Sequence, residues 1–163
     1  MALTRQVLEA RGFCGFVPFS LLATRLLPLD SGIYVVIRVS ASAPTFLAAS
    51  TAGWRKGSNP AVSTTQLAAK WVEGAKILYI GKADAGAAAG HGLRGRLRQY
   101  ARHGLGGTSH HGGRYIWQLQ DSAALLVAWR PTLDPRVEEK ALLAELAEFE
   151  TEHNALPFAN LRH

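Results

Sequence analysis

Cysteine and long hydrophobic runs are nearly missing from this chain of 163 residues. Its one cysteine, Cys14, cannot form an internal disulfide, and the first residues lack the charged-then-apolar layout of a secretion signal. The longest wholly apolar run, residues 123–129, is far shorter than the roughly 20 residues that span a bilayer. We therefore expect a cytoplasmic protein without a membrane segment, and the length predicts one domain over residues 1–163.

Acidic residues are scarce where basic residues gather. The chain has 12 Asp and Glu against 18 Lys and Arg, a net charge of +6. Residues 85–120 contain no Asp or Glu, whereas residues 138–152 are strongly acidic. The acid-free segment holds four of the six histidines and the arginines Arg94, Arg96, Arg98, Arg102 and Arg114. This segregation favours a polyanionic partner over an even, solubilising charge coat, and makes Arg94, Arg98 and Arg114 candidate nucleic-acid contacts, with a solvated basic face as the alternative.

Hydrophobic periodicity and capping residues predict helices and strands in alternation. Helices are expected over residues 4–10, 20–26, 63–72, 93–103 and 135–152, and strands over residues 32–39, 76–81, 114–120 and 123–129. Asp134 and Pro135 suit the start of the last helix as N-cap and first helical residue. The segment 53–60 is expected to be a loop, and its Arg55 and Lys56 are either phosphate contacts or a solvated pair.

The helix over residues 93–103 has two distinct faces. Arg96, Tyr100 and His103 are spaced i, i+4 and i+7 and share one face, which we expect to point toward a polar site. The packing stripe of the same helix is expected to consist of Leu93, Leu97 and Ala101.

The last helix places one glutamate in line with its apolar stripe. Glu139 aligns with the stripe of Leu142, Leu143, Leu146 and Phe149, whereas Glu138 aligns with Glu145, Glu148 and Glu152 on the expected solvent side. An ionised carboxylate is costly to bury unless a cation or hydrogen bonds compensate. Glu139 is therefore a candidate metal ligand, and the alternative is a carboxylate at the edge of the stripe paired with an arginine.

Two histidines, His110 and His111, are adjacent in the segment before residue 114. Zinc is not expected at His110 and His111, because two adjacent side chains point apart and the chain has one cysteine. The pair is either a surface turn or part of a functional site.

Two short strings lie on the predicted strands. Gly32-Ile33-Tyr34 begins one strand, and Tyr79-Ile80-Gly81-Lys82 ends another. With the Leu93-to-Leu97 pattern around Arg96, the pattern from Glu139 to Leu143, and Asn160 after Pro157, the chain resembles the GIY-YIG nuclease family over residues 32–160. The resemblance implies an α+β fold with a small, mainly antiparallel sheet of about three core strands plus a possible extra strand, flanked by helices. Residues 1–29 would then be a helical N-terminal extension, and residues 40–75 an insertion between the two motifs.

The resemblance also implies roles for individual side chains. Tyr34 would take a proton from water, Arg96 would contact the non-bridging phosphate oxygens, and Glu139 would hold one Mg²⁺ or Mn²⁺ ion. Tyr79 and Asn160 would orient the site, with Lys82 near the phosphate. His110 would approach the scissile phosphate or transfer a proton, and a surface turn is the alternative. The implied activity is metal-dependent hydrolysis of DNA, double-stranded or branched, and the oligomeric state stays open.

Two positions depart from the family pattern. Ile37 stands where many members have a lysine, with Arg38 next, and Tyr100 stands where many have a histidine. A tyrosine base working near pH 7 lies ~3 units below its reference pKa, a cost of roughly 4 kcal/mol that a nearby cation must offset. The missing lysine favours the alternative of a nucleic-acid-binding module with little or no turnover. A structural or protein-binding domain would explain the acidic helix but not the acid-free basic segment.

Overall fold

One of the two inner strands of the sheet is β2 (Gly32–Ile37), whose β-branched and aromatic residues are all buried. The computed structural model describes residues 2–85, 92–108, 112–150 and 156–161. The remaining elements are the strands β1 (Cys14–Pro18), β3 (Ile77–Ala83) and β4 (Leu126–Pro131), the helices α1 (Arg5–Ala10), α2 (Thr64–Lys70), α3 (Gly92–Gly104) and α4 (Pro135–Glu150), and the 3₁₀ turns η1 (Phe19–Thr24), η2 (Arg114–Gln118) and η3 (Ser122–Ala124). No helix in these ranges is long and apolar enough to cross a membrane.

The four strands form one sheet in the order β1-β4-β2-β3, and every pair that the register gives is antiparallel. The expected α+β class with a small antiparallel sheet flanked by helices is confirmed. Strand β3 lies at one edge of the sheet, so its outer side is not covered by another strand. The strand β1 was not among the expected strands, and it completes the opposite edge.

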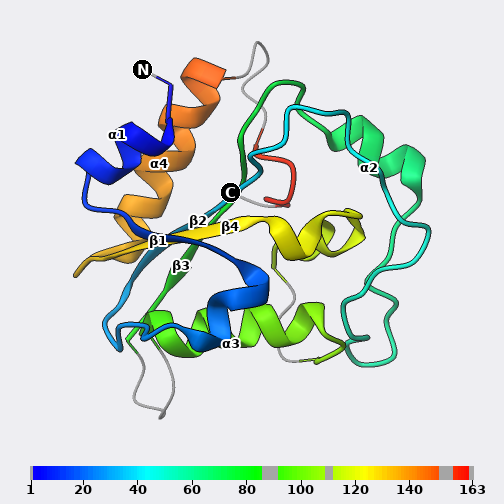
Figure 1. The fold of residues 1–163 in the computed structure, drawn as a ribbon, viewed down its shortest axis with the longest axis horizontal. Coiled ribbons are helices and arrows are strands. Elements are labelled where there is room, and N and C mark those ends of the chain that lie inside the picture. The colour runs from blue at the N-terminus through cyan, green and yellow to red at the C-terminus, as the bar shows by residue number, and fades with distance from the viewer. Residues whose placement is uncertain (1, 86–91, 109–111, 151–155, 162–163) are drawn as a thin grey trace.

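Alternate residues of β2 supply two separate cores. Ile33, Val35 and Ile37 pack into the cluster that includes the leucines of α4, and Tyr34 and Val36 pack into the cluster that includes those of α3. Figure 1 shows α1 and α4 on one side of the sheet and α3 on the other. The two helices that carry the expected site residues Arg96 and Glu139 therefore flank the sheet from opposite faces.

The ion pairs of α4 differ from the expected solvent-facing row of glutamates. Glu145 receives two hydrogen bonds of 2.7 Å from the guanidinium of Arg11, the C-cap residue of α1, and this contact lowers the pKa of the carboxyl. Glu138 pairs with Arg130 of β4. These two carboxylates hold α1 and β4 against α4, so the row does not simply face water.

Residues 114–120 form no strand, contrary to the expectation. Tyr115, Ile116 and Trp117 are buried consecutively within η2, a pattern that a one-sided strand cannot satisfy because its side chains alternate between two faces. The next strand begins at Leu126 rather than 123, because η3 occupies Ser122–Ala124. The helix expected over 20–26 is the 3₁₀ turn η1.

The segment 40–75 packs against the same core as the rest of the chain. Ser63 caps α2 through its hydroxyl, which accepts from the Gln66 backbone at 3.1 Å, as the sequence predicts. Leu67 of α2 is fully buried in the α3-side cluster. Trp71, just after α2, has its ring 5.1 Å from that of Phe158 near the C-terminus. The segment is therefore part of the domain's core.

Candidate active site

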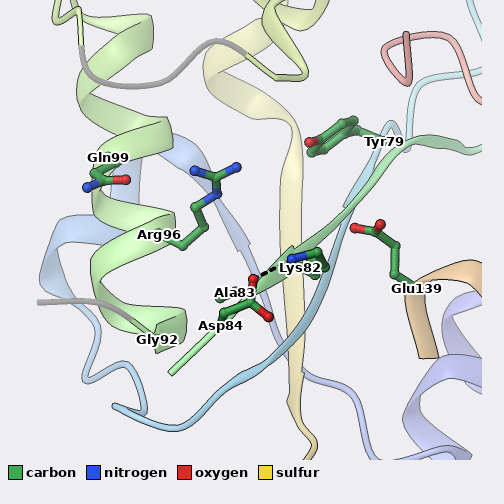
Figure 2. A pocket seen from close by; sticks show the side chains of 8 residues that line it. All are labelled: Tyr79, Lys82, Ala83, Asp84, Gly92, Arg96, Gln99 and Glu139. Atoms are coloured by element: carbon green, nitrogen blue, oxygen red, sulfur yellow. Dashed lines mark hydrogen bonds and ion pairs between the residues drawn. The ribbon is translucent and has the colours of Figure 1, made fainter. Parts of the chain in front are cut away.

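A pocket of about 360 Å³ opens beside the edge strand β3, between α3 and α4. Its lining residues are Tyr79, Lys82, Ala83, Asp84, Gly92, Arg96, Gln99 and Glu139. Figure 2 shows the Arg96 guanidinium, the Tyr79 hydroxyl and the Glu139 carboxylate pointing into one space from three different elements. The structure thus brings together four of the residues that the sequence singled out, because Lys82 also lines the pocket.

Arg96 reaches the pocket from the first half of α3. The start of this helix is held by the loop before β2, since Leu93 donates its backbone N–H to Asp30 and Arg94 donates to Pro28, each at 2.9 Å. The Nε atom of Arg96 is buried and has no hydrogen-bond partner among the described residues. A buried guanidinium nitrogen without an acceptor is uncommon, because desolvation of a charged donor is costly.

Tyr34 lies beneath the pocket rather than in its lining. It stands directly across the β2–β3 pair from Gly81, and a Cβ atom at Gly81 would come within 2.4 Å of the Tyr34 ring and 2.5 Å of its hydroxyl. The side chain has no exposed surface, and its hydroxyl lies close enough to Arg96 and Tyr79 for both to shift its pKa. Burial raises the pKa of Tyr34 well above its ordinary value of 10.0, Tyr79 adds to the rise, and Arg96 opposes it.

Tyr79 is the tyrosine that lines the pocket. Its ring centroid lies 6.0 Å from that of Tyr34 and 5.5 Å from that of Tyr100, and 8% of the residue is exposed. Burial raises the pKa of Tyr79, while the positive charge of Arg96 lowers it. The two motif tyrosines therefore differ in access: one meets the pocket and the other supports it from below.

The sequence predicts that Arg96, Tyr100 and His103 share a face of α3 that points toward a polar site, and this prediction is wrong for Tyr100 and His103. Tyr100 is fully buried and donates its hydroxyl to the Gly113 carbonyl at 2.7 Å. His103 is also fully buried, with its Nε2 atom 3.2 Å from the Gly53 carbonyl. The second half of α3 is covered by residues near η2 and by the segment 40–75, which helical periodicity alone cannot indicate. Of this face, only Arg96 reaches the pocket.

Glu139 lines the pocket from α4 and is half-buried. Burial raises the pKa of its carboxyl, Lys82 lowers it, Asp84 raises it and Arg96 lowers it. It forms no ion pair within the described ranges, unlike its neighbour Glu138. The alternative of a carboxylate already paired with an arginine is therefore not what the structure contains.

Asn160 supports the site from the edge of the sheet. Its amide oxygen accepts from the Ile80 backbone N–H and its amide nitrogen donates to the Ile80 carbonyl, both at 2.9 Å. The preceding Ala159 donates to the Leu78 carbonyl at 2.8 Å. The tail therefore pairs with β3 on either side of Tyr79, and Asn160 holds that strand without lining the pocket.

Lys82 is a residue of β3 that lines the pocket, and its ammonium already has an ion-pair partner. Its ammonium donates to the carboxylate of Asp84, two residues further on. Arg38, the cation beside Ile37, is instead buried in an ion pair of 2.9 Å with Asp121, outside the pocket lining. Sequence reasoning missed Asp84 and Gln99; the spacing of Gln99 three residues after Arg96, on the same side of α3, was the available signal.

The expected nucleic-acid contacts are spread along α3 and beyond it. Arg98, Arg55 and Lys56 are exposed. Arg94 is half-buried and donates to the Leu27 carbonyl at 2.9 Å, and Arg114 lies over the Tyr115 ring at 5.5 Å. His110 lies outside the described residues.

The donor set at the pocket suits a hard cation held by few protein atoms. The described residues contain no group of three or more His, Cys, Asp or Glu that could hold a metal ion. Mg²⁺ commonly binds through one or two carboxylates and keeps its remaining ligands as water or substrate phosphate. The half-buried carboxylate of Glu139, which faces the pocket without a protein partner, fits that description, and a closed multi-ligand zinc site does not.

A comparison of the chain with models of protein families, with curated proteins and with solved structures finds no match.

Proposed function

We propose that this protein is a metal-dependent endonuclease of the GIY-YIG type that hydrolyses phosphodiester bonds in double-stranded or branched DNA. We propose in addition that the protein is located in the cytoplasm. One observation carries the proposed nuclease activity: the Tyr79 hydroxyl, the Arg96 guanidinium and the Glu139 carboxylate converge on one pocket. A guanidinium that lines a pocket can bind phosphate oxygens through paired donors.

Phosphodiester hydrolysis needs a deprotonated nucleophile and charge neutralisation at the phosphorus oxygens. Arg96 would bind the non-bridging oxygens, since a guanidinium matches phosphate geometry through paired donors. Lys82 would exchange its contact with Asp84 for the incoming phosphate. Glu139 would hold the divalent cation, Mg²⁺ or Mn²⁺, which when bound supplies Lewis-acid stabilisation of the leaving oxygen.

We assign proton transfer to Tyr79, whereas the motif resemblance implies Tyr34. Tyr34 has no exposed surface and does not line the pocket, whereas Tyr79 does line it. We therefore place proton acceptance from the attacking water at Tyr79, which must first release its own proton to solvent and act as the phenolate, and give Tyr34 the role of positioning Tyr79 and Arg96. Burial raises the pKa of both hydroxyls, and Arg96 opposes that rise without reversing it.

The test is nicking of supercoiled plasmid with Mg²⁺ and with EDTA. The wild type should nick the plasmid only with the metal, and E139Q should lose at least about 100-fold in rate, as expected for loss of an essential charge-stabilising group. The matched control is E138Q, which removes the adjacent carboxylate that pairs with Arg130, and it should keep its activity.

Two outcomes would contradict the proposal. Nicking by E139Q at the wild-type rate would show that the metal assignment is wrong. A wild-type protein that binds DNA without nicking it under either condition would favour the nucleic-acid-binding module instead.

A further inference from the structure

Residues 54–58 form a tight turn that presents a tryptophan. Arg55 and Ser58 exchange two backbone hydrogen bonds, of 3.2 and 2.8 Å, around the central residues Lys56 and Gly57. Both central residues have positive φ angles, 50° and 74°, as in the type I′ turns that close two-residue hairpins. Because these hydrogen bonds fix the backbone of the turn, they also fix the backbone position from which the adjoining Trp54 side chain projects.

The turn is attached to the C-terminal end of α3, the helix that carries Arg96. Gly53 donates its N–H to the His103 carbonyl at 3.1 Å, and the Gly53 carbonyl lies 3.2 Å from the His103 ring nitrogen Nε2. A Cβ atom at Gly53 would lie 2.2 Å from the Gly107 carbonyl oxygen, so the loop and the helix end are in close contact. Figure 1 shows this loop beside the end of α3.

The chain on either side of Trp54 carries charges of one sign. Residues 31–72 contain no Asp or Glu, and Arg55, Lys56 and Arg102 are exposed. Arg55 and Arg114 both contribute to the lowered pKa of the buried His103, after the larger effect of burial, so both act electrostatically on the end of the helix. A polyanion is favoured here over an acidic or neutral segment of the same protein.

Trp54 itself is unusual among the tryptophans of the chain. It is 57% exposed, whereas Trp117 and Trp129 are 4% and 6% exposed and Trp71 is partly buried against Phe158. An indole held in water costs hydrophobic free energy that burial would recover. An exposed aromatic ring flanked by cations is the arrangement that binds unpaired bases, because every base has a face on which a ring can stack.

We infer that the Trp54 turn is a second nucleic-acid contact, in which Trp54 stacks on an unpaired base while Arg55 and Lys56 contact the neighbouring phosphates. The nature of the partner rests on the proposed function. From Arg96 to His103 the helix rises about 10 Å, or roughly three nucleotide steps along a strand. The turn would therefore select substrates with unpaired bases a few nucleotides from the scissile bond.

The experiment measures binding of the full chain in EDTA, so that no cleavage occurs, to a single-stranded oligonucleotide, a duplex with a short internal gap, and a blunt duplex. We expect the first two ligands to quench tryptophan fluorescence, and W54F to abolish the quenching while binding nearly as well. W54A should weaken binding to these two ligands by about 5- to 150-fold, the range that one base–aromatic stack covers. L133A is the matched control, because Leu133 is a fully exposed apolar residue after β4, and it should bind as the wild type does.

The cationic part of the contact has its own variant. K56N removes the charge but creates the Asn-Gly pair that type I′ turns prefer, so the turn should persist. Its log-log dependence of affinity on salt should become shallower by about 0.7 to 0.9. Equal affinity of W54A and wild type for all three ligands would overturn the inference, and so would a W54A defect confined to the blunt duplex or found only with a protein partner.

The two proposals fail in distinguishable ways. Tryptophan-dependent binding without plasmid nicking would contradict the endonuclease and leave the Trp54 contact standing. Nicking that E139Q abolishes, combined with binding that W54A leaves unchanged, would contradict only the Trp54 contact.

Discussion

Gly81 has no side chain at the point where the ring of Tyr34 crosses the β2–β3 pair. The two motif strings are thereby linked physically, because the tyrosine of the first occupies the space that a larger residue in the second would fill. The arrangement brings the Tyr34 hydroxyl to the strand that also carries Tyr79 and Lys82.

Substitution G81A should therefore destabilise the fold. Its Cβ would lie 2.4 Å from the fully buried Tyr34 ring, and overpacking of this kind costs about 1–3 kcal/mol. Urea denaturation measures the change as a lower midpoint at unchanged slope. A G81A midpoint equal to that of the wild type would show that the Tyr34 ring does not occupy this position.

At the scale of elements, the site depends on the edge strand β3 and on what holds it. The tail residues Ala159 and Asn160 pair with the backbone of Leu78 and Ile80, and thus supply the partner that a sheet edge lacks. The rest of β3, from Gly81 to Ala83, is outside these contacts and borders the pocket. The tail therefore sets the boundary between the covered and the open part of this edge.

Loss of the tail's amide should weaken both the fold and the site. N160A removes two buried hydrogen bonds and leaves the Ile80 N–H and carbonyl without partners, which costs about 1–3 kcal/mol. Urea denaturation measures this loss, and plasmid nicking should fall with it because Tyr79 precedes Ile80. The control is N59A, at an exposed asparagine that accepts one local hydrogen bond from Ala61, and it should change stability by no more than about 0.5 kcal/mol. Equal effects of the two substitutions would contradict a special role for the tail.

At the scale of the whole molecule, two hydrophobic clusters share one sheet. The cluster on the α3 side includes Ala52 and Leu67 of the segment 40–75 together with Phe158 of the tail, and the other includes Leu8 and the leucines of α4. Because β2 contributes side chains to both clusters, neither can be lost while the sheet remains intact.

We therefore expect one cooperative unfolding transition. Tryptophan fluorescence, which reports Trp117 and Trp129 in the α3-side cluster together with Trp54 and Trp71 of the segment 40–75, and far-ultraviolet circular dichroism should give the same urea midpoint. A separate early transition in fluorescence would show that the segment 40–75 unfolds as its own unit.

Local sequence pattern was sufficient for the elements whose burial is one-sided or complete. The strand of Gly32 and Tyr34, the helix capped by Ser63, and the helix beginning at Pro135 were all predictable, because caps and periodicity act over a few residues. The run from Arg114 to Gln118 was not, since its consecutive buried residues satisfy contacts with α3 and with the tail rather than a local period.

Sequence by itself determined the residue types of the candidate site: two tyrosines on neighbouring strands, an arginine on one helix and a glutamate in line with the apolar stripe of another. Only the tertiary structure decided which of them meet the pocket. Tyr34 and Tyr79 are the same residue type, but Tyr79 keeps 8% of its surface exposed and lines the pocket, whereas Tyr34 is completely enclosed in the α3-side cluster. Burial depends on residues brought from distant parts of the chain, and no local pattern encodes that sum.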